Sequence, residues 1–186
     1  MDLQRKRPRA DAVAEFRTFL EEKGGPDWRT NPEHLPFKFV QSKGANPPTT
    51  MLVCVAAIDE AWKIYPEREA RICADGNNQI GERTERLVAH LKAGGDLYPS
   101  TAATNQESGG MVFVDGRHRF ALLRDAGVRC LPIATYDPDS LQPYATTLEK
   151  EKANLANESE SPPMPLQGRL TKEGSPPAIK QPEIVS

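Results

Sequence analysis

The segment Met111–Tyr136 constrains the fold of this chain more than any other, because each of its boundaries carries a recognisable signal. In order it contains an apolar strand, a turn, a helix, a glycine that ends the helix and a second strand: residues 111–114, Asp115–Gly116, 117–126, Gly127 and 130–136. The short strands and the amphipathic helix between them indicate a chain that mixes sheet and helix.

The remaining elements extend this pattern on the N-terminal side. Apolar spacing predicts helices over residues 11–23 and 82–93, and extended segments are predicted over residues 37–41 and 97–103. Residues 51–65 carry two signals, since residues 52–55 favour a strand and residues 56–62 favour a helix. We therefore predict an α+β fold, a small mixed sheet flanked by helices.

Composition separates folded from unfolded chain. A length of 186 residues corresponds to about 1.2 average domains, and 17 prolines with only 38% hydrophobic residues indicate that part of the chain lacks a core. From about Thr147 the sequence is rich in charge and proline, which predicts a disordered tail over residues 146–186. Within it Pro162 and Pro165 fit either a partner's aromatic groove or a solvated tail without a partner.

The N-terminal residues 1–10 form a basic arm ahead of a folded domain over residues 11–145. Arg5, Lys6, Arg7 and Arg9 would neutralise phosphates of DNA, or they would only keep the terminus soluble. The formal net charge of the whole chain is −2, which argues against a wholly basic nucleic-acid coat.

Cysteine usage and hydropathy indicate a cytoplasmic protein. Cys54, Cys73 and Cys130 are odd in number and form no CxxC pair, so reduced thiols are expected. There is no apolar N-terminal run typical of a signal peptide and no stretch long enough for a membrane span, so no membrane partner is expected. The three histidines lack metal-ligand spacing, and no metal site is predicted.

The start of the predicted helix at residue 117 is the best candidate for chemistry. A glycine there allows close approach to the backbone, and the first helical N–H groups and the positive end of the helix dipole favour an anion. Arg117, His118 and Arg119 lie in this first turn, where the dipole opposes their charge. Either Asp115 and other carboxylates compensate them, or a bound phosphate does.

Two segments resemble the ParB/sulfiredoxin-like superfamily. VFVDGRHRFALLRDAGVRCLPI, residues 112–133, resembles its vDGxHRxxAlxxxG signature, and LVAHLKAGGDLYPS, residues 87–100, resembles the preceding box. Arg117 stands where sulfiredoxins carry their reactive cysteine, so that activity is not expected. The triphosphate-binding GERR of chromosome-partitioning ParB proteins reads Gly116-Arg-His-Arg119 here, without its acidic residue, and no helix-turn-helix domain is expected after residue 136.

The resemblance implies a stand-alone nucleotide- or phosphate-binding module of bacterial or mobile-element type, associated with DNA through its arm. The residues implied to line its phosphate pocket are Gly116, Arg117, His118, Arg119, Ser100 and Thr101, with CTP or ATP as ligand. Asp115 would hold Mg²⁺ or orient a nucleophile, or it would only cap the helix. Two alternatives stay open: a nucleotide-dependent enzyme that hydrolyses NTP, transfers phosphoryl groups or cleaves nucleic acid, and a non-catalytic interaction scaffold.

Overall fold

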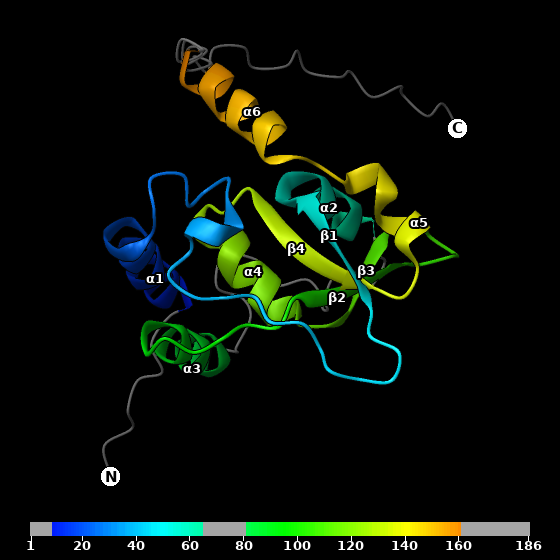
Figure 1. Cartoon of the computed structure of the whole chain (residues 1–186), viewed down its shortest axis with the longest axis horizontal. Helices are drawn as coiled ribbons and strands as arrows, with labels where there is room; N and C mark the ends of the chain where they lie inside the picture. Colours follow the sequence, from blue (N-terminus) through cyan, green and yellow to red (C-terminus); the bar gives the residue numbers. More distant parts are fainter. Residues whose placement is uncertain (1–8, 65–80, 161–186) are drawn as a thin grey trace, which may run out of the picture.

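The computed structural model describes residues 9–64 and 81–160 (Figure 1). Along the chain the elements are α1 (Arg9–Lys23), η1 (Pro32–His34), β1 (Thr49–Cys54), α2 (Val55–Lys63), α3 (Gly81–Lys92), β2 (Ser100–Thr104), β3 (Met111–Asp115), α4 (Arg117–Ala126), β4 (Cys130–Thr135), α5 (Pro138–Leu141), η3 (Gln142–Tyr144) and α6 (Leu148–Glu160). The described residues contain the α-helices α1 to α6 and one mixed sheet of four strands, which confirms the predicted α+β class. None of the helices in these two ranges has the length and apolarity needed to cross a membrane.

The four strands form one mixed sheet in the order β1-β4-β2-β3. β4 lies inside the sheet, antiparallel to β1 and parallel to β2, and β2 pairs with β3 as an antiparallel hairpin. The small mixed sheet flanked by helices is therefore confirmed, including the hairpin, the α4 helix and its end at Gly127, which adopts a left-handed φ of 97°.

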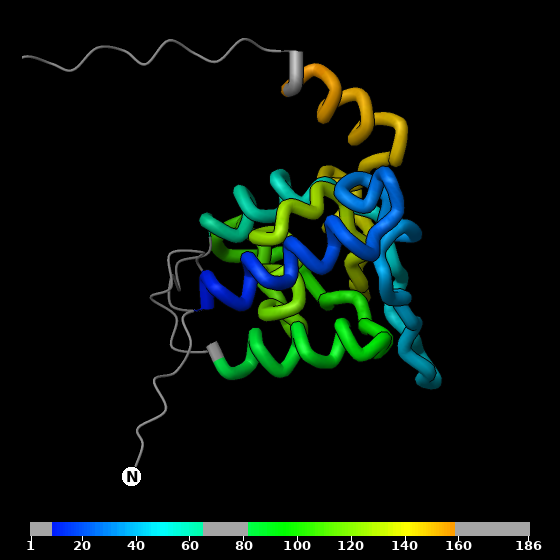
Figure 2. The backbone as a smooth tube through the Cα atoms, turned by 90° about the vertical axis from the view of Figure 1, so that its left-hand side faces the viewer, coloured from blue at the N-terminus to red at the C-terminus, as the bar shows by residue number. Residues whose placement is uncertain are grey.

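Helices α1, α3 and α4 pack together, and Figure 2 shows α1 lying across α4 with α3 beneath. The core that they share with α2 and the sheet contains large, fully buried side chains: Phe16, Leu20, Trp62, Leu91, Phe120, Leu122 and Ile133. Trp62 of α2 meets Phe113 of β3 edge to face at 4.8 Å between ring centroids, and Phe113 contacts Phe120 of α4 at 4.7 Å. This aromatic cluster holds the end of β3 against the first turns of α4.

The predicted strand over residues 37–41 is reduced to one parallel bridge between Phe39 and Leu97. Leu97 donates to the carbonyl of Lys38, and Val40 donates to the carbonyl of Leu97. In a parallel ladder the next donor would be the residue two after Leu97, which is Pro99 and has no N–H. The ladder therefore stops after one pair, and β2 begins only at Ser100 rather than at residue 97.

The ambiguous residues 51–65 contain both predicted elements in turn. β1 ends at Cys54 and α2 begins at Val55 without a connecting loop. The burial of Val55, Ile58, Ala61 and Trp62 forms a helical stripe on α2.

The prediction of a disordered tail over residues 146–186 is wrong for its first part, because residues 148–160 form helix α6. Glu151 is 1% exposed and accepts a hydrogen bond from the Thr146 hydroxyl at 2.9 Å. Lys152 pairs with Asp27, and Glu158 pairs with Arg129 through two bonds of 2.6 Å. Polar partners from distant segments hold α6, so apolar periodicity could not predict it. Pro162 and Pro165 lie outside the described residues.

The predicted basic arm is also shorter at its folded end. Arg9 is the first residue of α1, its side chain is 2% exposed, and it pairs with Asp125 of α4 at 2.5 Å. Arg9 is therefore part of the fold and does not offer its charge to DNA. Arg5, Lys6 and Arg7 lie outside the described residues.

Candidate functional site

The loop between β3 and α4 is positioned by one glycine and one buried serine. Gly116 has a φ of 78°, a left-handed conformation that side chains rarely adopt, and serves as the N-terminal cap of α4. Ser100 of β2 is 5% exposed, and its hydroxyl donates to the Gly116 carbonyl at 2.9 Å. Ser100 thus holds the loop and is not part of the surface around it, which corrects its predicted role in the pocket.

Asp115 does not cap α4. Its carboxylate accepts a hydrogen bond from Arg119 at 2.6 Å, and no side chain within residues 9–64 and 81–160 accepts from the first N–H groups of the helix. Asp115 is 74% exposed and ends β3, one residue too early to reach those N–H groups. The sequence suggested that either Asp115 or a bound phosphate compensates the positive charges of this turn. Asp115 compensates the charge of Arg119.

Arg119 lies folded back over Gly116. A Cβ at position 116 would stand 2.5 Å from Arg119 Nη2 and 2.7 Å from Nε, so the flexible guanidinium would have to move away from the loop. Nε of Arg119 is buried without a hydrogen-bond partner. The arginine therefore occupies the space beside the loop and has unused donor capacity there.

A hollow of about 300 Å³, which we call the α4 hollow, opens beside this loop. Its lining includes all four predicted residues from Gly116 to Arg119, together with Arg83, Phe113, Val114 and Asp115. Arg83 comes from α3 and brings Nη1 to 3.5 Å from His118 Nε2. Among the lining residues that the structure describes, Asp115 is the single carboxylate against three guanidiniums. Glu82 and Glu85 of α3 do not line this hollow.

Sequence reasoning missed Arg83. The only available signal is its place four residues before the inward-facing Leu87, which puts it on the same side of α3. That α3 packs beside the first turn of α4 is a property of the fold and not of any local pattern.

His118 is neutral at physiological pH. Burial, followed by the charges of Arg117 and Arg83, lowers the pKa of His118 from 6.5 to about 4. Its neutral ring can accept a hydrogen bond from Arg83, and no carboxylate among the described residues stands in that place. An anion in the α4 hollow would relieve the cationic repulsion that depresses this pKa.

A second hollow of about 330 Å³, the tyrosine hollow, adjoins the first and shares Val114, Asp115 and Arg119 with it. Tyr98 and Tyr136 line it, and they are 53% and 68% exposed. Thr101 lines this hollow and not the α4 hollow, because consecutive residues of β2 point to opposite sides and Ser100 faces the loop. The pair Asp115–Arg119 stands between the two hollows.

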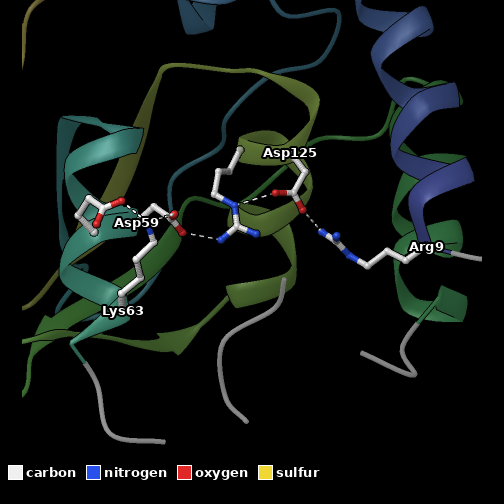
Figure 3. Close-up of polar contacts among 6 residues, drawn as sticks. Arg9, Asp59, Lys63 and Asp125 are labelled. Atoms are coloured by element: carbon white, nitrogen blue, oxygen red, sulfur yellow. Dashed lines mark hydrogen bonds and ion pairs between the residues drawn. The ribbon is translucent and has the colours of Figure 1, made fainter. Parts of the chain in front are cut away.

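The C-terminal half of α4 is anchored by a chain of charges across three helices (Figure 3). Asp125 accepts from Arg9 of α1 at 2.5 Å and from Arg124 at 2.7 Å, and Arg124 in turn pairs with Asp59 of α2 at 2.5 Å. Lys63, one turn further along α2, lies 3.8 Å from Asp59. These pairs fix the direction of α4 and hence the position of the α4 hollow.

Within residues 9–64 and 81–160 no three or more His, Cys, Asp or Glu side chains gather as a metal site. Comparison with protein-family models, with curated proteins and with solved structures finds no match to this chain.

Proposed function

We propose that this chain is a nucleotide-binding module that holds phosphate groups in the α4 hollow. The observation that carries the proposal is the convergence of Arg83, Arg117 and Arg119 on the first turn of α4, with a single lining carboxylate. Guanidinium forks, free helical N–H groups and a positive dipole end all favour a phosphate over a neutral ligand. Among the described residues, neither Arg83 nor Arg117 has an ion-pair partner that would satisfy its charge.

The tyrosine hollow favours a nucleotide over a simple phosphate ion. Tyr98 and Tyr136 offer ring faces on which a base stacks, and Thr50, Thr101 and Gln41 add hydroxyl and amide groups for its polar edge. Because the two hollows meet at Asp115–Arg119, one ligand with a base and a phosphate chain would span both. The resemblance to ParB-like proteins supports the same ligand class, with CTP and ATP as the candidates. Mg²⁺ would bind mainly through the phosphate oxygens, with Asp115 as the nearest carboxylate.

Isothermal titration with CTP and ATP, with and without Mg²⁺, tests the proposal. Arg83→Ala should weaken binding about 10- to 150-fold, since a hydrogen bond to a charged group contributes ~1.5–3 kcal/mol. Arg86→Ala is the matched control, because Arg86 lies on the same helix and lines neither hollow. No heat with either nucleotide, or equal losses in the two variants, would contradict the proposal.

The same titrations separate the two hollows. Tyr136→Ala should weaken nucleotide binding, because stacking on one base contributes ~1–3 kcal/mol, and should leave the affinity for tripolyphosphate unchanged. Release of inorganic phosphate that disappears in Asp115→Asn would add hydrolysis to the function, whereas a flat baseline would leave a binding module.

A further inference from the structure

Two of the three cysteines stand directly opposite each other in the sheet, although they are far apart in the sequence. Cys54 at the end of β1 pairs in register with Cys130 at the start of β4. Opposite residues in an antiparallel pair place their side chains on the same face. The sequence could not reveal this proximity, because it depends on the register of two strands.

The hydrogen-bond phase of the ladder gives the geometry of the pair. Val55 donates to the carbonyl of Arg129 at 2.8 Å, so the position next to the cysteines is of the hydrogen-bonded type. Consistently, the carbonyl of Leu52 accepts from Thr146 at 3.0 Å on the edge of β1 that faces away from β4. The two types of pair alternate, so Cys54 and Cys130 form a non-hydrogen-bonded pair.

A non-hydrogen-bonded pair is the type whose side chains approach most closely. Its Cα atoms lie about 4.5 Å apart, which falls within the range of about 4.4–6.8 Å that disulfides span. A bond between the two sulfurs therefore needs side-chain rotation and no displacement of either strand.

The two thiols differ in their surroundings. Cys130 is fully buried, its sulfur donates to the carbonyl of Thr30 at 3.2 Å, and burial raises its pKa to about 12. Cys54 is half-buried and caps the start of α2 without a side-chain hydrogen bond. Cys54 is thus the thiol that a small reagent meets first, and Cys130 stays protonated behind it.

A hollow lies next to this pair on the same face of the sheet. Leu52 and Pro132, the next pair on that face, line a hollow of about 920 Å³ between the sheet and the segment around Leu35 and Phe37. A small, uncharged oxidant in this hollow would lie beside the residue pair that adjoins the cysteines.

We propose that Cys54 and Cys130 form a redox-modified dithiol that a small peroxide converts into a disulfide between β1 and β4. The Cys54 thiolate attacks one oxygen of hydrogen peroxide, the O–O bond breaks, and the released hydroxide takes up the thiol proton as water. The Cys130 sulfur then attacks the sulfenic sulfur of Cys54, and the S–O bond breaks. The proton of Cys130 leaves with the hydroxyl group as a second water, so peroxide is reduced and both sulfurs are oxidised.

The test uses the full chain in its folded, reduced form. The protein is treated with hydrogen peroxide, then denatured, labelled with a maleimide and mapped by mass spectrometry. The expected result is a linked peptide pair containing Cys54 and Cys130, loss of maleimide at both, and reversal by dithiothreitol. Cys73→Ser should behave like the wild type, while Cys54→Ser should leave Cys130 fully labelled.

A second measurement uses only the wild type and so does not depend on how well the variants fold. In the wild type, peroxide should raise the midpoint of thermal unfolding, because the cross-link closes a long loop, and dithiothreitol should reverse the shift. Linkage of either residue to Cys73, or full labelling of both cysteines after peroxide treatment, would overturn the proposal. So would oxidation of Cys54 to a sulfinic acid beside a free Cys130. The proposal is independent of the nucleotide site.

Discussion

Replacing Asp125 by asparagine should destabilise the fold more than any other single charge neutralisation within the α1–α4–α2 chain of charges. The Arg9 side chain is 2% exposed and that of Asp125 6%, and the carboxylate serves Arg9 and Arg124 together. Asparagine would leave two neighbouring guanidiniums without this negative charge in a site that water hardly reaches. Removal of one member of a buried ion pair costs about 3–5 kcal/mol.

Urea unfolding followed by circular dichroism measures this loss. With a slope of about 2 kcal/mol per molar urea, typical of small domains, the midpoint should fall by about 1.5–2.5 M while the slope stays constant. Asp139→Asn on the exposed surface of α5 is the control and should change stability by less than about 1 kcal/mol.

A double variant tests whether the loss comes from the broken ion pair between Arg9 and Asp125 or from weaker packing of α1 against α4. Arg9→Met with Asp125→Leu should recover part of the loss, because an apolar pair of similar volume removes the buried cation together with the carboxylate that it pairs with. A loss of unfolding free energy below about 1 kcal/mol in Asp125→Asn would match the small contribution of an exposed ion pair. It would mean that water screens these charges and that they do not hold α1 against α4.

Two further predictions concern the loop and the histidine of the α4 hollow. Gly116→Ala should destabilise the protein slightly more than Gly109→Ala. Both glycines have positive φ, but only a Cβ at 116 would push the Arg119 guanidinium aside and disturb its pairing with Asp115. Thermal unfolding of both variants measures the difference, and equal losses would contradict the contact. The pKa of His118 is about 4 in the folded protein and 6.5 in the unfolded chain, so the unfolded chain binds more protons between these two pH values. The stability that neutral His118 provides above about pH 6.5 is therefore lost as pH falls towards 4. Urea titrations from pH 7 to 4 should therefore show a smaller loss of unfolding free energy for His118→Gln than for the wild type. Equal losses in the two proteins would contradict the lowered pKa of His118.

The elements that the sequence predicted well are those whose signals are local. Gly127 ends α4 because glycine accepts the left-handed conformation there, and the apolar run of β3 has no competing interpretation. The prediction of a strand over residues 37–41 failed because the strand could continue only with an N–H from residue 99 in another segment, and that residue is a proline. Helix α6 failed because its partners, Asp27 and Arg129, lie far away in the sequence.

The candidate site was predicted in part for the same reason. Gly116 to Arg119 are consecutive, so one turn of helix brings them together, and the structure places them around one hollow. Ser100 and Thr101 were assigned a common role, yet strand alternation sends them to different places. Arg83 could be found only once α3 was packed against α4.

Two prolines border the point where β2 begins to pair with β4, close to the serine that holds the β3–α4 loop. The parallel ladder of β2 and β4 begins at Ser100 and Ile133, and the residue just before each of these is a proline, Pro99 and Pro132. A slip of β2 by one residue would place Pro99 where the ladder needs an N–H donor, or would shift Ser100 away from the Gly116 carbonyl. Pro99 and Pro132 thus help to fix the register of β2 against β4. Substitution of either proline should allow a second register, which would be seen as doubled backbone NMR resonances for residues 99–101.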